Sequence, residues 1–308
     1  MRDLLAAFLR NLRGLIVFGG VTINTLFWFV PIFVLAIFKL VLPFKIFRRS
    51  LTRVLMAMGE NWISCNRLIL AGGGTLHWKA NGIDDLRKEG WYLVLANHQT
   101  WVDILVLQTI FNRRIPFLKF FIKQELIWFP FLGVAWWALD MPFMKRYTPS
   151  YLAKHPEKKG KDLEATQRAC QRFSDTPTSV INFIEGTRFS EQKRNDRQSP
   201  YDNLLPPRAG GIAIALSSMG EIFDAILDVT IVYPDGVPKF WGLCCGDRVQ
   251  VIAEVRRRAI EQPLIHGDYQ GDRVFRRQMH QWLGSIWLEK DQRIDALLRD
   301  SQSSTRVA

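Results

Sequence analysis

The sequence predicts an α/β fold in which helices flank a largely parallel sheet. Two short apolar stretches, residues 91–96 and 179–184, have the length and composition of buried strands. Segments with helical spacing alternate with such strands along the chain, and this alternation is typical of parallel sheets. An uncharged run near the N-terminus adds a membrane-embedded helical segment to this layout.

The composition indicates one large domain and an acidic partner. With 308 residues and 48% hydrophobic content, the chain can bury a substantial core, and we expect one catalytic domain over residues 51–308. The formal charge of +12 favours nucleic acid, anionic lipid or an acidic carrier, and charge alone does not choose among them. The basic residues lie scattered without an aromatic-studded basic motif, so we expect no nucleic-acid partner.

The cysteines suggest neither a zinc site nor a disulfide framework. Cys65, Cys170, Cys244 and Cys245 include no C-x-x-C spacing. A reduced domain facing the cytoplasm is the simpler interpretation. No cluster has metal-ligand spacing, so we expect a reaction without a metal ion.

Residues 1–50 are predicted to hold an interfacial helix and a membrane anchor. Residues 2–13 place leucines and Phe8 on one stripe opposite arginines, and residues 15–38 carry no charge. As a helix this run would span about 36 Å, enough to cross a hydrocarbon core of about 30 Å. It is too long for a signal-peptide core, so we expect it to be retained.

The topology of this anchor is open between a single span and a re-entrant hairpin. Arg2, Arg10 and Arg13 precede the run and several basic residues follow it, so both flanks look cytoplasmic. Gly19-Gly20 and Pro31 could break the run into two short helices that return to the same side. In either form we expect the anchor to supply location only, so that a chain lacking residues 1–46 should stay folded.

The remaining elements are predicted from periodicity and turn signals. Helices are expected over residues 51–70, 103–111, 165–173, 211–219 and 273–299. Strands are expected over residues 75–80, 91–96, 179–184, 229–233 and 249–255. The polar stretches 148–161 and 189–203 are expected to be surface loops.

The first motif with catalytic chemistry is the pair His98 and Asp103, just past a predicted strand. Imidazole can abstract a proton from a hydroxyl group, while a carboxylate fixes its tautomer and stabilises the imidazolium. Thr100-x-x-Asp103 is also a helix-capping pattern, in which the histidine would be incidental. Because the aspartate can do both, the two interpretations do not exclude each other.

The second motif follows the second apolar strand and consists of Glu185, Gly186, Thr187 and Arg188. Alone it could be a strand-to-loop turn, with the glycine supplying an unusual conformation. Parallel strands, however, present their carboxyl ends on one edge of a sheet, where α/β proteins place their sites. We therefore expect both motifs to face the same crevice.

The blocks Asn97-His98-x-x-x-x-Asp103 and Glu185-Gly186-Thr187-Arg188 resemble the hallmarks of the glycerolipid acyltransferases, particularly the lysophosphatidic acid acyltransferases. Residues 140–146 and 229–234 resemble two further blocks of that family, in the same order. The run at 137–146 is similar to a bacterial inner-membrane subgroup of probable acyltransferases. Ile184, Phe189 and Lys145 depart from the family pattern, which leaves the acceptor headgroup open.

The resemblance implies a glycerol-3-phosphate acyltransferase-like fold and assigns roles to the motif residues. His98 and Asp103 match the catalytic pair, and residues 185–188 match the acceptor-binding block. Arg146 and Arg188 are expected to bind the acceptor phosphate, because guanidinium groups can bind phosphate at two points. Lys123 and Arg208 are further candidates, with a solvated basic residue as the alternative for each.

The implied reaction is direct acyl transfer from a thioester, acyl-CoA or acyl carrier protein, to the hydroxyl of a lysophospholipid. The expected acceptor is 1-acyl-glycerol-3-phosphate and the product phosphatidic acid, with no bound cofactor. No G-x-S-x-G elbow is present to supply a serine nucleophile. The alternatives are another headgroup, a hydrolase, and a non-catalytic membrane protein that binds anionic lipid. The resemblance places the chain at a bacterial inner membrane, with its catalytic domain on the cytoplasmic side.

Overall fold

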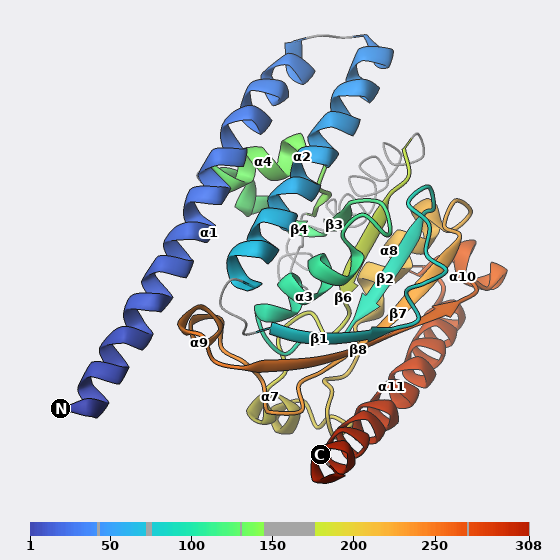
Figure 1. The fold of residues 1–308 in the computed structure, drawn as a ribbon. Helices are drawn as coiled ribbons and strands as arrows, with labels where there is room; N and C mark the ends of the chain where they lie inside the picture. Colours follow the sequence, from blue (N-terminus) through green and yellow to red (C-terminus); the bar gives the residue numbers. More distant parts are fainter. Residues whose placement is uncertain (42–43, 72–75, 130, 145–175, 270, 308) are drawn as a thin grey trace.

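The core of the computed structural model is a six-stranded sheet in the order β1-β8-β7-β2-β6-β3 (Figure 1). The structure describes residues 1–41, 44–71, 76–129, 131–144, 176–269 and 271–307. The strands are β1 (Leu76–Asn81), β2 (Tyr92–Ala96), β3 (Leu118–Phe120), β6 (Ser179–Phe183), β7 (Ala225–Val232) and β8 (Val249–Arg258). A separate pair is formed by β4 (Ile122–Lys123) and β5 (Phe143–Met144).

The sheet is largely parallel, which confirms the predicted fold class. β2 lies in the middle and pairs in parallel with both β6 and β7, while β3 pairs in parallel with β6. β8 runs antiparallel to β7, and β1 pairs in parallel with β8. The carboxyl ends of four adjacent strands, β7, β2, β6 and β3, therefore lie on one edge of the sheet, where the two sequence motifs were expected to meet.

Helices cover both faces of the sheet, and the alternation within β2 shows why. Leu93 and Leu95 pack into the cluster that includes α8 (Ala209–Met219) and α11 (Arg273–Val307). Tyr92, Val94 and Ala96 point to the opposite cluster, which includes α3 (Val102–Phe111). Because neighbouring side chains of a strand point to opposite faces, a strand buried on both sides is apolar throughout. All five residues of β2 are buried.

β7 begins at Ala225, four residues before the predicted strand. The prediction started too late because Asp228 interrupts the apolar run. In the structure Asp228 is buried and its carboxylate lies 2.6 Å from Lys290 Nζ and 3.0 Å from Arg258 Nε. A buried charge is tolerated when it is paired, so the strand continues through this residue.

The predicted loop at residues 189–203 contains a short helix, α7 (Glu191–Asp196), so that prediction was partly wrong. Ser190 Oγ accepts a hydrogen bond from Lys193 N and caps the helix, although the segment lacks apolar periodicity. Other elements that were not predicted are short: β3, β4, β5, η1 (Gln124–Trp128), α4 (Leu132–Ala138), α9 (Phe240–Cys245) and α10 (Gln262–Ile265). The predicted helix at 165–173 and loop at 148–161 lie outside the described residues.

The N-terminal region is a pair of helices rather than an interfacial helix followed by a separate anchor. α1 (Arg2–Val41) is continuous through Gly19, Gly20 and Pro31, so the hairpin weighed within residues 15–38 does not form. α2 (Lys45–Ala71) begins earlier than predicted and runs back beside α1 (Figure 1). Asn24 of α1 donates a hydrogen bond to Asn66 Oδ1 of α2, and both residues are buried.

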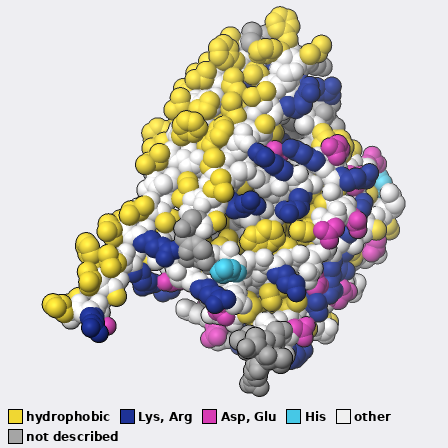
Figure 2. Space-filling model, in the orientation of Figure 1, with side chains coloured by type: hydrophobic (Ala, Val, Ile, Leu, Met, Phe, Trp, Pro, Cys, Tyr) yellow, Lys and Arg dark blue, Asp and Glu magenta, His cyan; other side chains and the backbone are white. Residues whose placement is uncertain are grey.

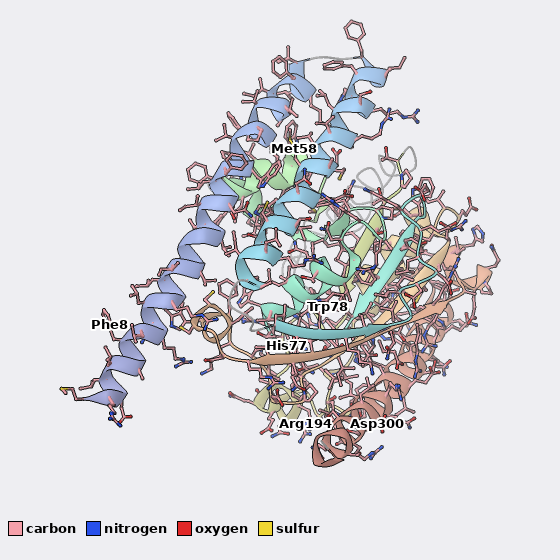
Figure 3. The ribbon with its side chains drawn as sticks, viewed as in Figure 1. Phe8, Met58, His77, Trp78, Arg194 and Asp300 are labelled. Atoms are coloured by element: carbon pink, nitrogen blue, oxygen red, sulfur yellow. The ribbon has the colours of Figure 1, made fainter. Side chains whose placement is uncertain are left out.

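α1 is long and apolar enough to cross a membrane by length and composition. Only 17% of its most apolar window is buried, which is far less than a core helix would bury. Figure 2 shows hydrophobic side chains gathered along this helix, and Phe8 projects away from the body of the protein in Figure 3. The exposed apolar residues include Leu4, Phe8, Leu15, Ile23, Phe27, Val30, Ile37 and Leu40.

Candidate active site

Three adjacent strands end at the site, and each contributes a polar residue. His98 follows β2, Glu185 follows β6 and Tyr233 follows β7. Because β6 and β7 flank β2 in parallel, their carboxyl ends meet at one edge of the sheet. The sequence motifs therefore come together as predicted.

His98 and Asp103 form a hydrogen-bonded pair. His98 Nδ1 lies 2.8 Å from Asp103 Oδ2. Since an ionised carboxylate can only accept, Nδ1 carries the proton and Nε2 is left with a lone pair. The imidazole stacks on the ring of Phe183, with centroids 4.0 Å apart. The histidine side chain is 13% exposed, so its ring is held firmly but still reaches the surface.

Asp103 is fully buried and serves both functions considered for it. Its Oδ2 accepts hydrogen bonds from the backbone N–H groups of Gln99, at 2.6 Å, and Thr100, at 2.9 Å. These bonds tie down the turn that leads into α3, as the capping pattern predicts. The same oxygen orients His98, so capping and orientation are combined in one carboxylate.

Tyr233 is a site residue whose role sequence reasoning missed. Its hydroxyl donates a hydrogen bond of 2.5 Å to Asp103 Oδ1, the oxygen that does not face His98. Burial raises the pKa of Tyr233 far above its usual value, and the negative charge of Asp103 raises it further. The phenol therefore stays protonated and remains a donor. The sequence signal that could have identified Tyr233 as a site residue was its position at the end of the apolar strand predicted over residues 229–233.

Asn97 and Thr100 fix the loop that carries the histidine. The Asn97 side chain donates to Ile231 O at 2.9 Å and accepts from Ile231 N at 2.8 Å. It thereby extends the pairing of β2 with β7 beyond the end of β2. Thr100 Oγ1 donates to Pro238 O at 2.7 Å and attaches the loop after β7.

Glu185 was expected to bind substrate, but its carboxylate is occupied by the protein's own backbone. Oε1 accepts from His98 N at 2.8 Å, and Oε2 accepts from Leu205 N at 3.0 Å. The side chain is completely buried. Burial raises the pKa of Glu185 to about 7, although these two hydrogen bonds favour the ionised form. We interpret Glu185 as a residue that positions the loop of His98.

The C-terminal helix supports this arrangement from the other side. Trp287 Nε1 of α11 donates to Leu205 O at 3.0 Å, so Leu205 links α11 to Glu185. Lys290, one turn further along, is buried beside Asp228. Burial lowers the pKa of Lys290, and the pairing with Asp228 opposes that shift.

Gly186 is required by its backbone conformation and by a close neighbour. Its φ of +69° lies in the left-handed region that other residues rarely adopt. A Cβ atom here would stand 3.1 Å from Arg208 Cδ, so the arginine side chain lies across the turn. The hydroxyl of Thr187 accepts a hydrogen bond from Lys193 Nζ. The structure thus brings Arg208 to the second motif, as the sequence hypothesis required.

Arg188 lies on the outer rim of the site. Its guanidinium carbon stands 5.0 Å from the ring centroid of Trp101, a residue of the His98 loop that is 59% exposed. Lys193 Nζ donates to Arg188 O and fixes its backbone. The two motifs therefore meet at the surface through a cation–π contact as well as in the interior.

Two predicted binding residues, Lys123 and Arg146, have side chains that the structure does not describe. Lys123 belongs to β4 in the separate two-stranded sheet, and its side chain is not described. Arg146 lies outside the described residues. Within the described ranges, no three His, Cys, Asp or Glu side chains are grouped to hold a metal ion. The expected absence of a metal ion stays a prediction.

Residues 77–234, just over half of the chain, match the family model described as Acyltransferase. The chain belongs to the acyltransferase family. The matched segment runs from β1 to Pro234 and contains His98, Asp103, Glu185, Arg188 and Tyr233. The family suggested by the four sequence blocks is thereby confirmed.

Several relatives of this acyltransferase family member are 1-acyl-sn-glycerol-3-phosphate acyltransferases. The gamma protein of Mus musculus is 26% identical over 249 residues, which cover 77% of this chain and 59% of that protein. The delta protein of Homo sapiens is 26% identical over 213 residues, covering 65% and 51%. The chain therefore spans less than two thirds of the length of these relatives. A solved structure, the LPA acyltransferase PlsC from Thermotoga maritima, aligns with a TM-score of 0.49 and 15% identity, covering 93% of this chain and 98% of that chain.

Proposed function

We propose that this protein transfers a fatty acyl group from an acyl thioester to the free hydroxyl of 1-acyl-glycerol-3-phosphate, giving phosphatidic acid. The observation that carries the proposal is the hydrogen-bonded His98–Asp103 pair, at 2.8 Å, together with the exposed guanidinium of Arg188 over Trp101 of the same loop. The first can activate a hydroxyl and the second can bind a phosphate. The names of the relatives support the choice of acceptor.

In the proposed mechanism His98 acts as a general base. Nε2 takes the proton of the acceptor hydroxyl while Asp103 stabilises the imidazolium through Nδ1. The hydroxyl oxygen attacks the thioester carbonyl, and the tetrahedral intermediate collapses by breaking the carbon–sulfur bond. The imidazolium returns its proton to the thiolate, so the products are the new ester and a free thiol. No acyl-enzyme forms on this route.

The outer rim of the site is proposed to bind the acceptor headgroup. Arg188 is exposed and held over Trp101, so its guanidinium is accessible to a phosphate. Arg208 lies across Gly186 in the same motif. Lys123, of β4, and Arg146, which follows β5 in the sequence, remain proposed contributors. The donor is an acyl thioester, carried by CoA or by acyl carrier protein.

We further propose that α1 attaches the protein to a bacterial inner membrane, with the catalytic domain on the cytoplasmic side. The apolar side chains along α1 support this attachment (Figure 2). The domain division proposed is residues 1–50 for the anchor and 51–308 for catalysis. A lysophospholipid acceptor is itself a membrane component, so attachment would bring enzyme and substrate together.

The test is a donor-by-acceptor matrix measured on the purified full-length chain in detergent. Acyl-CoA and acyl carrier protein thioesters are each combined with lysophosphatidic acid and with lysophospholipids of other headgroups, and the lipid products are resolved. We expect phosphatidic acid to form only when donor and lysophosphatidic acid are both present. Free fatty acid alone would indicate a hydrolase, and no turnover of any thioester would indicate a non-catalytic lipid-binding protein.

A further inference from the structure

The segment between α7 and α8, residues 197–208, belongs to no helix or strand, so its backbone N–H and C=O groups need partners elsewhere. At its end, Arg208 N donates to Ile184 O at 2.9 Å. Further inside it, Leu205 N donates to Glu185 Oε2 at 3.0 Å. The segment therefore borders the second sequence motif directly.

One face of α11 is turned toward this segment. Trp287, Asp291 and Asp295 follow one another at intervals of four residues, a spacing that places side chains on one face of a helix. Trp287 is completely buried, and its Nε1 donates to Leu205 O at 3.0 Å. Leu205 is thus held by both of its backbone groups, its N–H by Glu185 and its carbonyl by Trp287.

Asp291 holds the residues just before Leu205. Its Oδ2 accepts from Asp202 N at 2.9 Å, and its Oδ1 accepts from Asn203 N at 2.8 Å. Asp295 Oδ1 accepts from the side chain of Asn203 at 2.8 Å. Asp291 is buried, and bonds from N–H groups to an ionised carboxylate are among the strong ones. α11 therefore fixes two successive backbone N–H groups as well as the carbonyl of Leu205.

Lys290 fixes α11 to the sheet at the level where β2 ends. Its side chain is buried, and its Nζ donates to Val229 O of β7 at 2.5 Å. Val229 is the partner of Ala96, the last residue of β2, and His98 follows two residues later. The helix that holds the 197–208 segment is thus itself attached beside the strand that carries the histidine.

The contacts continue from Leu205 through Glu185 to His98. Glu185 Oε1 accepts from His98 N at 2.8 Å. Burial raises the pKa of Glu185, and of the two hydrogen bonds that oppose this shift, the one from Leu205 N has the larger effect. Without that donor the buried carboxylate would no longer be held in place against the backbone of His98. A general base must lie within hydrogen-bond reach of the proton that it takes, so the position of this backbone matters for the reaction.

We infer that Trp287 and Asp291 are positioning residues for catalysis: they hold Leu205 N–H against Glu185, which in turn fixes the backbone of His98. The inference rests on the proposed function. α11 lies beyond residues 77–234, which the family model matches, so these two residues stand outside the family's sequence blocks. The C-terminal helix has a role in the reaction besides covering one face of the sheet.

The experiment measures kcat and both KM values for Trp287→Phe and Asp291→Asn, purified in detergent. Trp287→Phe removes the indole N–H and keeps an aromatic ring, whereas Asp291→Asn keeps the shape of the side chain and replaces one acceptor oxygen by an NH₂ group. We expect kcat to fall about three- to tenfold in each variant, which corresponds to one lost hydrogen bond, with the acceptor KM within about twofold of wild type.

Amide hydrogen exchange of the same proteins shows whether the effect reaches the histidine. Exchange in a peptide that contains residues 97–101 should become at least about threefold faster in both variants, because the bond from His98 N to Glu185 opens more often. A peptide from β1, near the far edge of the sheet, should keep its wild-type rate. A substitution that only loosened the whole fold would change both peptides alike.

The matched control is Trp62→Phe. Trp62 Nε1 of α2 donates to Thr25 Oγ1 of α1 at 3.2 Å, a contact between the two N-terminal helices. The control loses the same N–H donor and the same ring volume as Trp287→Phe. Its kcat and its exchange at residues 97–101 should stay within about twofold of wild type, as expected for a hydrogen bond outside the site.

A wild-type kcat in either folded variant, or unchanged exchange at residues 97–101, would overturn the inference. A raised acceptor KM with unchanged kcat would also overturn it, because the segment would then act on the rim through Arg208. If Trp287→Phe does not fold, the isosteric Asp291→Asn decides. Failure of the proposed function looks different: the wild-type chain would then form no phosphatidic acid, while exchange would still report whether α11 fixes the loop of His98.

Discussion

The inner and outer halves of the site differ in how their side chains are held. On the inner side, Asp103 and Glu185 are completely buried, and each accepts two backbone N–H groups. On the outer rim, Arg188 is exposed and contacts the largely exposed ring of Trp101. The inner half is organised before any substrate arrives, whereas the rim keeps a cation available to a ligand. We therefore expect inner substitutions to change kcat and rim substitutions to change KM.

The largest expected effect is that of His98→Ala. A positioned general base contributes about 10²–10⁴-fold, so kcat should fall by that factor while the fold survives. The acceptor KM should change little, because the imidazole belongs to the inner half. Circular dichroism serves as the folding control. Retention of more than about a tenth of the activity in the folded variant would remove His98 from the mechanism.

Glu185→Gln tests whether the carboxyl of Glu185, in the inner half of the site, has a raised pKa in the folded protein. The ordinary pKa of a glutamate carboxyl is 4.5, and burial raises the pKa of Glu185 to about 7 in the folded protein. At low pH this carboxyl is protonated in both the folded and the unfolded protein. Between these values the unfolded chain releases a proton that the folded chain keeps, so stability falls as pH rises and stays constant above pH 7. The shift corresponds to a loss of about 3 kcal/mol at about 1.36 kcal/mol per pH unit.

In Glu185→Gln that part of the pH dependence should disappear, because the amide does not titrate. The free energy of unfolding, measured in urea at pH 5 and pH 8 for both proteins, checks this. A variant that loses stability with rising pH as steeply as the wild type would show that Glu185 titrates normally.

Arg188→Ala is the matching change on the rim. Loss of a charge-assisted contact with phosphate should raise the acceptor KM about 10–100-fold and leave kcat nearly unchanged. Trp101→Ala is the matched control, since an exposed cation–π contact contributes only about 0.5–1 kcal/mol, or two- to fivefold in KM. If the donor KM rose in Arg188→Ala instead, the arginine would belong to the thioester side.

Tyr233→Phe should have the smallest effect on the inner half. It removes the hydroxyl that donates to Asp103 Oδ1 but keeps the ring that fills the space. A lost hydrogen bond to a carboxylate lowers kcat by about tenfold, without a change in acceptor KM. Full activity of Tyr233→Phe across the pH range would mean that Asp103 orients His98 without this donor.

The motif residues were predictable because strand ends in a parallel sheet fix where they meet. The run at 91–96 placed His98 and Asp103, and the run at 179–184 placed Arg188, from chain order alone. What the sequence did not reveal depends on long-range pairing. Glu185 was expected to bind substrate. Its carboxylate instead accepts a hydrogen bond from the backbone of Leu205, which lies 20 residues away in the sequence. Tyr233 reaches Asp103 across 130 residues, a contact that no local pattern encodes.

In the N-terminal region, too, the features that the sequence did not reveal depend on contacts between residues far apart in the chain. Its apolar composition predicted a helix, and the structure contains one, but glycine and proline were given too much weight as breaks. α1 packs against α2, α4 and α9 and is continuous through Pro31. Lys39 is buried and pairs with Asp140, which lies 101 residues further along the chain. The inward orientation of Lys39 therefore could not be read from the residues that flank it.

The most direct test of the central claim, that His98 acts as a base in a direct transfer, is the release of thiol from acyl-CoA in the absence of acceptor. Enzyme at micromolar concentration is mixed rapidly with acyl-CoA, and free thiol and acylated protein are followed by absorbance and intact-protein mass spectrometry. We predict no burst of thiol and no acyl-protein until lysophosphatidic acid is added, when thiol and phosphatidic acid should form at equal rates. A burst equal to the enzyme concentration, with an acyl group on the protein, would contradict the account.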